Sequence, residues 1–225
     1  MSKAISFRLS AVALRSIQIQ APKLPALAWR QLAEDLADHF PVSDYVIAFD
    51  CLQVSFAGQL PARAILPRLS EFCQNWRYRP SSIEPRQVVV PVYYSQQSGA
   101  DLASLAERTE LSPEAIVDCH TSQTYQVAAV GFQAGFAYLE GLASVLHTPR
   151  HSTPRARVPA GSVAIANGQC AIYPQASPGG WNLIGRTPVP QAWLNELDSL
   201  LKVGDTLVFE AISQEQYLSM GGELD

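Results

Sequence analysis

Lysine is scarce in this sequence, and long apolar runs are missing from it. The 225 residues include three lysines, and the formal net charge is −4. A net-negative surface that is poor in lysine argues against binding of nucleic acid or of anionic membranes. No apolar run approaches the roughly 20 residues that a membrane-spanning helix needs. We therefore expect neither nucleic acid nor a membrane among the partners.

The cysteines exclude two further classes of protein. There are four of them, widely spaced and without a CxxC pair: Cys51, Cys73, Cys119 and Cys170. Because no secretory signal is recognisable at the N-terminus, we expect reduced thiols in a cytoplasmic protein rather than a disulfide framework. The spacing also argues against structural zinc, and we expect no metal site in the protein.

Common nucleotide-binding and hydrolase motifs are absent as well. The sequence has no GxxxxGK[ST], no GxGxxG, no HExxH and no GxSxG. These absences exclude a P-loop, a Rossmann dinucleotide site, a zincin centre and a nucleophile elbow. If the chain binds ATP, it does so without the Walker motif.

The first third of the chain alternates between strand and helix patterns. Apolar residues with a period of two predict strands at 5–10, at 12–19 and, on both sides of a tight turn near Asp50, within 44–57. Helical spacing predicts amphipathic helices at 25–40 and 62–76, the second perturbed by Pro67. This β2-α-β2-α succession predicts a small α+β N-terminal domain, residues 1–84.

A second domain, residues 85–225, is predicted after the proline- and serine-rich stretch 78–87. Its patterns predict strands at 88–94, 124–132 and 203–213, and helices at 101–110, 112–120 and near 191–201. Eight of the 13 glycines and seven of the 16 prolines lie between residues 131 and 190. That texture predicts short strands joined by shaped turns, as in a closed or nearly closed β-barrel.

A basic, proline-rich run, 147–162, is the first candidate for chemistry. Its arginines, Arg155 and Arg157 among them, suit bidentate recognition of carboxylate or phosphate, although a solvated basic loop explains them equally well. The segment 158–174 is predicted to form a hairpin around Asn-Gly-Gln. Ser162 and Gln169 would then lie at strand ends, either as ligand contacts or as turn caps.

The stretch SPGGWNLIGRTP, 177–188, is the second candidate. The Gly179-Gly180 pair lets backbone amides approach an anion closely, because no Cβ intervenes. Trp181 offers a flat apolar wall and Arg186 a fork of donors, an arrangement suited to a small planar polar molecule. The alternative is a tight turn with Trp181 in the core.

A third candidate is the pair His120 and Tyr125, at the expected end of one helix and start of the next strand. A histidine there acts either as a general base or as a partner of the helix dipole. The following run GFQAGFAYLEGL, 131–142, repeats glycine with aromatic residues. Those rings either line a pocket or fill the core.

These motifs occur in an order that resembles the KipI/PxpB family. The stretches are HTSQTY (120–125), GFQAGFAYL (131–139), TPRHSTPRARVPAGSVAIANGQCAIYP (148–174) and SPGGWNLIGRTP (177–188). The family is also known as the B-type subunit of 5-oxoprolinase, allophanate hydrolase subunit 1, or carboxyltransferase subdomain C/D. Three stretches depart from its usual pattern, at Ala134 and Ala137, in AIANGQCAIYP, and in SQQSG (95–99), which replaces a glycine-rich turn. We therefore expect a retained site with an altered rim.

The resemblance implies a mainly β, cyclophilin-like barrel for the second domain. It also implies ATP with Mg²⁺ as co-substrate and two partner proteins, one of the KipA type and one of the LamB/YcsF type. Together such proteins hydrolyse 5-oxoproline to glutamate. Alternatives within the family are a regulator that inhibits a sensor histidine kinase and a component of urea or allophanate metabolism.

Within that resemblance, residues at matching positions receive roles. The expected catalytic residues are His120, Tyr125 and Arg186. The expected substrate- or nucleotide-binding residues are Arg155, Arg157, Ser162, Gln169, Ser177, Gly179, Gly180 and Trp181.

Overall fold

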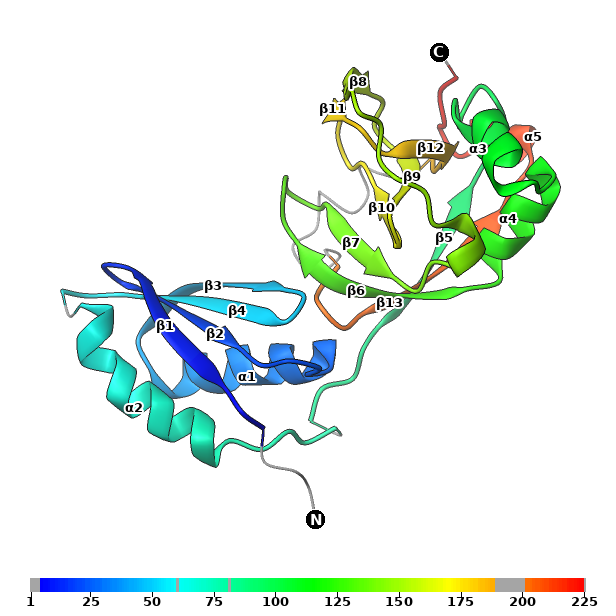
Figure 1. Ribbon diagram of the computed structural model, residues 1–225. Coiled ribbons are helices and arrows are strands. Elements are labelled where there is room, and N and C mark those ends of the chain that lie inside the picture. The colour runs from blue at the N-terminus through cyan, green and yellow to red at the C-terminus, as the bar shows by residue number, and fades with distance from the viewer. Residues whose placement is uncertain (1–4, 60, 81, 189–200, 225) are drawn as a thin grey trace. The chain divides into compact units, whose positions relative to one another are not determined.

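The computed structural model describes residues 5–59, 61–80, 82–188 and 201–224 (Figure 1). The chain forms two compact units, residues 1–85 and 86–225, each with its own core. The helix expected near 191–201 lies almost wholly outside the described residues. Both units combine helices with largely antiparallel sheet, so the α+β character expected of the first domain extends to the second.

The first unit is a four-stranded antiparallel sheet with two helices on one face (Figure 1). Its elements are β1 (Arg8–Ala13), β2 (Ser16–Gln20), α1 (Ala26–His39), β3 (Val42–Ala48), β4 (Cys51–Phe56) and α2 (Ala62–Asn75). The strand order is β1-β2-β4-β3. Alternate residues of the two central strands, such as Ile17 and Leu52, are fully buried, which is the period-two pattern of a sheet with one covered face.

Two details of this unit differ from the expectation. The hairpin between the first two strands turns at Leu14-Arg15, four residues later than predicted. The turn contains no glycine, proline or asparagine, and the alternation therefore gives no sign of where the strand ends. Helix α2 runs without a break through Pro67, whose side chain is exposed. The tight turn at Phe49-Asp50 is confirmed.

The second unit contains a larger sheet and a small separate one. Its strands are β5 (Gln87–Val92), β6 (Thr124–Val130), β7 (Ala137–Glu140), β8 (Arg155–Val158), β9 (Ser162–Ala166), β10 (Gln169–Ile172), β11 (Ser177–Gly179), β12 (Asn182–Arg186) and β13 (Thr206–Ala211). Its helices are α3 (Leu102–Thr109), α4 (Pro113–Thr121), η1 (Ser144–Leu146) and α5 (Gln214–Ser219). In the larger sheet the order is β5-β13-β6-β7-β10-β9-β12, and β8 pairs only with β11.

Local sequence signals explain several of these elements. Ser112 caps α4 by accepting a hydrogen bond from the Ala115 amide at 3.1 Å, as predicted. The β9–β10 hairpin turns at Asn167, whose φ of 57° is the left-handed conformation that Asn tolerates. The short helix α5 was not predicted, although Ser213 and Gln216 form a complete capping box at its start.

Parallel pairing of β5 with β13 is reinforced at one end by a buried carboxylate. Asp205 is fully buried and accepts hydrogen bonds from Arg86 Nη2 at 2.8 Å and from the Lys202 amide at 3.0 Å. These bonds link the start of β5 to the turn that precedes β13. The pairing itself joins residues more than 110 positions apart, such as Leu207 and Val88.

Candidate functional site

Arg155 and the glycine pair meet at the small β8–β11 sheet. Arg155 lies opposite Gly179 in the ladder, and the His151 amide donates to the Gly180 carbonyl at 2.7 Å. A Cβ at position 179 would collide with the Tyr173 hydroxyl. Glycine at this position lets the Tyr173 ring approach the backbone closely, and its φ is not in the left-handed region.

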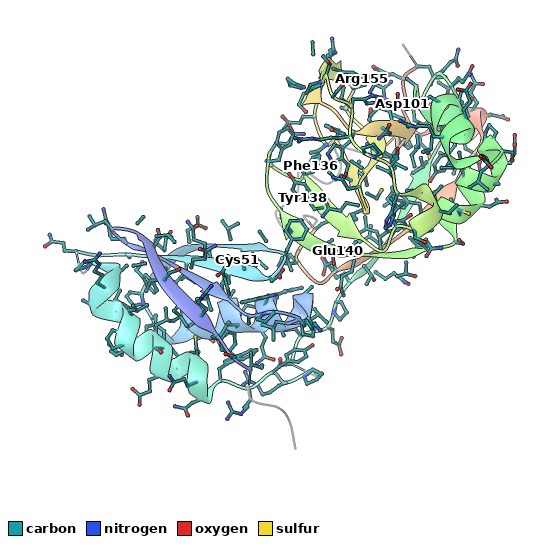
Figure 2. The ribbon with its side chains drawn as sticks, in the orientation of Figure 1. Cys51, Asp101, Phe136, Tyr138, Glu140 and Arg155 are labelled. Atoms are coloured by element: carbon teal, nitrogen blue, oxygen red, sulfur yellow. The ribbon has the colours of Figure 1, made fainter. Side chains whose placement is uncertain are left out.

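A buried carboxylate that the sequence reasoning missed lies behind Arg155. Asp101 Oδ1 accepts a hydrogen bond from Arg155 Nη2 at 2.6 Å, and Oδ2 accepts one from the Leu183 amide at 2.7 Å. Asp101 and Arg155 are labelled in Figure 2. Burial by itself would raise the pKa of Asp101. The hydrogen bonds from Arg155 and Leu183 outweigh that effect, so its pKa is lowered and the carboxylate is charged at neutral pH.

The local sequence around Asp101 hides this role. An Asp just before a helical run is a typical N-cap, yet the Asp101 side chain makes no capping hydrogen bond to α3. It reaches instead to β8 and β12, whose partner residues are 54 and 82 positions away. No pattern of local spacing signals such contacts.

Aromatic rings form a layer beside this pair. Phe136, Tyr138, Tyr173 and Trp181 pack on a buried cluster that includes Ala164, Ala171 and Leu183. The Trp181 ring meets Phe136 and Tyr138 edge-on, with centroid distances of 6.2 and 6.0 Å. Trp181 is half-buried, so it contributes to the core and also presents an apolar surface.

Two polar atoms in this region have no hydrogen-bond partner. Among the described residues, three enclosed side-chain atoms lack one, and two of these are His151 Nε2 and Ser177 Oγ. His151 Nε2 lies 3.2 Å from Asp101 Oδ1 without hydrogen-bond geometry. Buried polar groups are nearly always paired, so these two unpaired atoms mark places that a polar ligand or water can complete.

His120 and Tyr125 lie together, but in a buried network of their own. The Tyr94 hydroxyl is 2.8 Å from His120 Nδ1, Cys170 Sγ is 3.3 Å from Nε2, and the Tyr125 hydroxyl donates to the His120 carbonyl at 3.0 Å. The His120 side chain is 0% exposed, and burial lowers its pKa to about 3. The ring is therefore neutral at physiological pH, and proton transfer to a ligand stays a prediction for this pair.

Arg186 and Ser162 lie opposite one another in the β12–β9 ladder. Arg186 donates from Nε to the Ala160 carbonyl and from Nη1 to the Glu223 carbonyl, each at 3.0 Å. Its backbone also pairs with Tyr93, just after β5. Ser162 is buried. These contacts give Arg186 a part in holding loops together.

The remaining candidates are placed less centrally. Arg157 is an exposed residue of β8 and lies two positions after Arg155, the residue of that strand that binds Asp101. Gln169 lies at the turn end of the β9–β10 hairpin, opposite Ala166 and Glu140. Ser162 is at the other end of that hairpin, so the structure does not bring it together with Gln169.

The described residues contain neither a potential metal cluster nor a membrane-spanning helix. No group of three or more His, Cys, Asp or Glu side chains there could hold a metal ion. No described helix is both long and apolar enough to cross a membrane.

Comparison with known sequences identifies similar proteins. The family model of the carboxyltransferase domain, subdomain C and D, matches residues 8–197. The chain is 43% identical over 145 residues to the B-type subunit of 5-oxoprolinase from Haemophilus influenzae, a match that covers 64% of this chain and 68% of that protein. It is 39% identical over 159 residues to the B-type subunit of 5-oxoprolinase from Bacillus subtilis, covering 69% of this chain and 63% of that one.

Solved structures give a consistent result. The crystal structure of TTHA0988 matches with a TM-score of 0.74 at 33% identity, covering 89% of this chain and 40% of that chain. The Kluyveromyces lactis urea amidolyase matches with a TM-score of 0.75 at 15% identity, covering all of this chain and 16% of the other, which is a likeness of fold alone. The chain thus spans less than half of the TTHA0988 chain.

Proposed function

This chain belongs to the family of the carboxyltransferase domain, subdomains C and D, and from that premise we propose that it acts as the B-type subunit of an ATP-dependent 5-oxoprolinase. The complex would hydrolyse 5-oxo-L-proline to L-glutamate. The names of the relatives at 43% and 39% identity support this activity. The observation that carries it is the Arg155 guanidinium, fixed by a buried carboxylate beside a half-buried tryptophan.

The substrate offers groups that this site can recognise. 5-Oxoproline has one carboxylate, an apolar ring edge and a lactam amide. Arg155 is one-third exposed and would pair with the carboxylate through the N–H groups that Asp101 does not use. Trp181 would cover the ring, and the Ser177 hydroxyl and the amides of Gly179 and Gly180 would face the polar edge.

ATP is required because a lactam is a resonance-stabilised amide. Transfer of the γ-phosphoryl group to the lactam oxygen makes the ring carbon a better electrophile. Water then adds to that carbon and the C–N bond breaks, which gives γ-glutamyl phosphate and ADP. A second water hydrolyses the acyl phosphate, and the products are glutamate, ADP and phosphate. We assign Arg157 and Arg186 to neutralising the phosphoryl charge, with Ser162 and Gln169 as further polar contacts. Mg²⁺ would be held by the phosphate oxygens, since the described residues offer no cluster for it.

His120 and Tyr125 are assigned to proton handling. The Tyr94–His120–Cys170 network supports this assignment, because hydrogen bonds connect each His120 ring nitrogen to a partner that can exchange a proton. A link from that network to the substrate would come from a partner protein or from a closed state of the complex.

The partners follow from the same premise. We propose a KipA-type protein and a LamB/YcsF-type protein as the other two components, in a cytoplasmic complex. The relatives' designation as one lettered component of 5-oxoprolinase supports an enzyme built from several chains.

We also propose two domains, 1–84 and 85–225, the second a closed cyclophilin-like barrel. Support for closure comes from the bridge between Tyr93 and Arg186, which joins the β12 edge to the residue following β5.

The decisive experiment is reconstitution. The chain is co-purified with a KipA-type and a LamB/YcsF-type protein, and ATP hydrolysis that depends on 5-oxoproline is measured. Arg155→Ala should lower kcat/KM roughly a hundredfold, because a charged hydrogen-bonded contact to the substrate carboxylate is lost. Arg150→Ala, at an exposed arginine of the same run, is the matched control and should leave the rate unchanged.

Two results would overturn this assignment. A complex without turnover would refute the function, and full activity of Arg155→Ala would refute the site. Tight binding to a histidine-kinase dimerisation domain without turnover would favour the regulatory alternative. Carboxylation or hydrolysis of urea-derived substrates by the complex would favour the urea and allophanate alternative.

A further inference from the structure

Asp101 occupies the junction of three segments of the second unit. Its backbone amide donates to the Leu183 carbonyl at 3.0 Å, and its carbonyl accepts from the Leu105 amide at 2.8 Å. Its side chain binds Arg155 of β8 and the Leu183 amide of β12. One buried residue therefore fixes the start of α3, the strand β8 and the segment that follows Trp181.

The geometry at the carboxylate is specific to an ionised Asp. Each oxygen accepts a different short hydrogen bond, Oδ1 from Arg155 at 2.6 Å and Oδ2 from Leu183 at 2.7 Å. The side-chain amide of an Asn at this position would turn its NH₂ group towards either the Arg155 guanidinium or the Leu183 amide. Two donors would then face each other, and an N–H group would be left unpaired. The side chain of Asp101 is 6% exposed, so water offers little substitute.

Arg155 depends on this partner for its direction. Among the described residues, the only other hydrogen bond of its side chain is a long one of 3.5 Å from Nη1 to the Trp181 carbonyl. A long, flexible side chain that is one-third exposed would otherwise sample several rotamers. Holding it in a single orientation removes that entropy cost from ligand binding.

We propose that Asp101 is the positioning residue of the site, orienting the Arg155 guanidinium and the Trp181–Leu183 backbone for a carboxylate ligand. This inference rests on the proposed function, in which Arg155 receives the substrate carboxylate. Asp101 itself acts through Arg155 and does not touch the substrate. It also neutralises the charge of Arg155, so the pair presents aligned N–H donors rather than a bare cation, which favours a monoanionic ligand over a polyanion.

The test is a double-mutant cycle on the reconstituted complex. Asp101→Asn, Arg155→Lys and the double variant are compared for kcat and for the substrate KM. Asp101→Asn should raise KM roughly tenfold to a hundredfold with a smaller change in kcat, because orientation of a charged contact is lost. The double variant should be little worse than Arg155→Lys alone, since both changes act on the same contact.

A control and a second background keep the test decisive. Asp118→Asn, at an exposed carboxylate of α4, should leave KM unchanged. If Asp101→Asn does not fold, the comparison moves to Arg155→Ala with and without Asp101→Asn, where the second change relieves an unpaired buried charge and should be tolerated. In that background the KM should change less than about twofold, because no guanidinium remains to be oriented.

The outcomes separate the inference from the function. Additive effects in the cycle, or an unchanged KM in Asp101→Asn, would refute the positioning role while leaving the enzyme assignment intact. A wild-type complex that hydrolyses no ATP in response to 5-oxoproline would refute the function, and this inference with it.

Discussion

At the scale of single residues, burial decides which chemistry a side chain can perform. His120 lies in the last turn of a helix, where a histidine can serve as a base or pair with the helix dipole. In the structure it is enclosed by Tyr94, Tyr125, Cys170 and Phe209, and both ring nitrogens have partners. The cost of burying a charge keeps it neutral.

A pH-dependent free energy of unfolding is the expected consequence. The pKa of His120 is about 3 in the folded protein and about 6.5 in an unfolded chain. Between these values the unfolded chain binds the additional proton, so stability is lost as pH falls from about 6.5 towards 3, by up to about 1.4 kcal/mol per pH unit. Asp101, whose pKa is lowered, adds a further loss only below about pH 4.

Urea unfolding at several pH values between about 7.5 and 5 measures this slope. His120→Gln should flatten it, whatever its effect on stability at neutral pH. His39→Gln, at an exposed histidine of α1, is the control and should retain the wild-type slope. A slope that persists in His120→Gln would assign the titration to another group.

At the scale of elements, a close backbone contact fixes the segment between β5 and α3 against strand β12. Gly99 lies in this connection, and a Cβ there would collide with the Ile184 carbonyl and lie 2.7 Å from the Gly185 amide nitrogen. Because these are backbone atoms, no rotation of a side chain relieves the collision. The same contact places Asp101, two residues later, against Leu183.

Gly99→Ala should therefore destabilise the protein by about 1–3 kcal/mol, the usual cost of forced overpacking. Gly131→Ala is the matched control, because a Cβ at that position meets nothing within 4 Å and its φ is not positive. Thermal unfolding of the two variants gives the comparison. Equal melting temperatures would show that the connection yields without strain.

At the scale of the whole molecule, the chain divides into two units with separate cores. Fully buried residues occur in both, Trp29 and Leu36 in the first and Tyr125 and Phe209 in the second, the last exposed by only 2%. Between the units runs a segment with exposed residues at Pro80, Ser82 and Glu84. Each unit should therefore survive a break in this segment.

Brief digestion with thermolysin tests this expectation, because the protease cleaves before large apolar residues. The first cut should fall before Ile83 and release two fragments that resist further digestion. Ile83→Asp should slow that cut without changing the rest of the digest. Early loss of either fragment would indicate a unit that depends on the other for its stability.

The periodicity of apolar residues in the sequence predicted most helices and strands, and the order of the sequence motifs indicated the family. The helices α1 and α4, the turn at Asp50 and the β9–β10 hairpin follow from spacing, capping and Asn-Gly chemistry, all local effects. Arg155 and the glycine pair were candidates because their residue types fit anion binding, and the structure places Arg155 opposite Gly179 in one ladder.

Tertiary structure alone decided which of those residues work together. Asp101 meets Leu183 across 82 positions, and His120 meets Cys170 across 50. Such partners are set by sheet pairing and core packing, which sum many weak contacts over the whole unit and leave no local pattern in the sequence. The charge of Asp101, the neutrality of His120 and the half-buried position of Trp181 all follow from that packing.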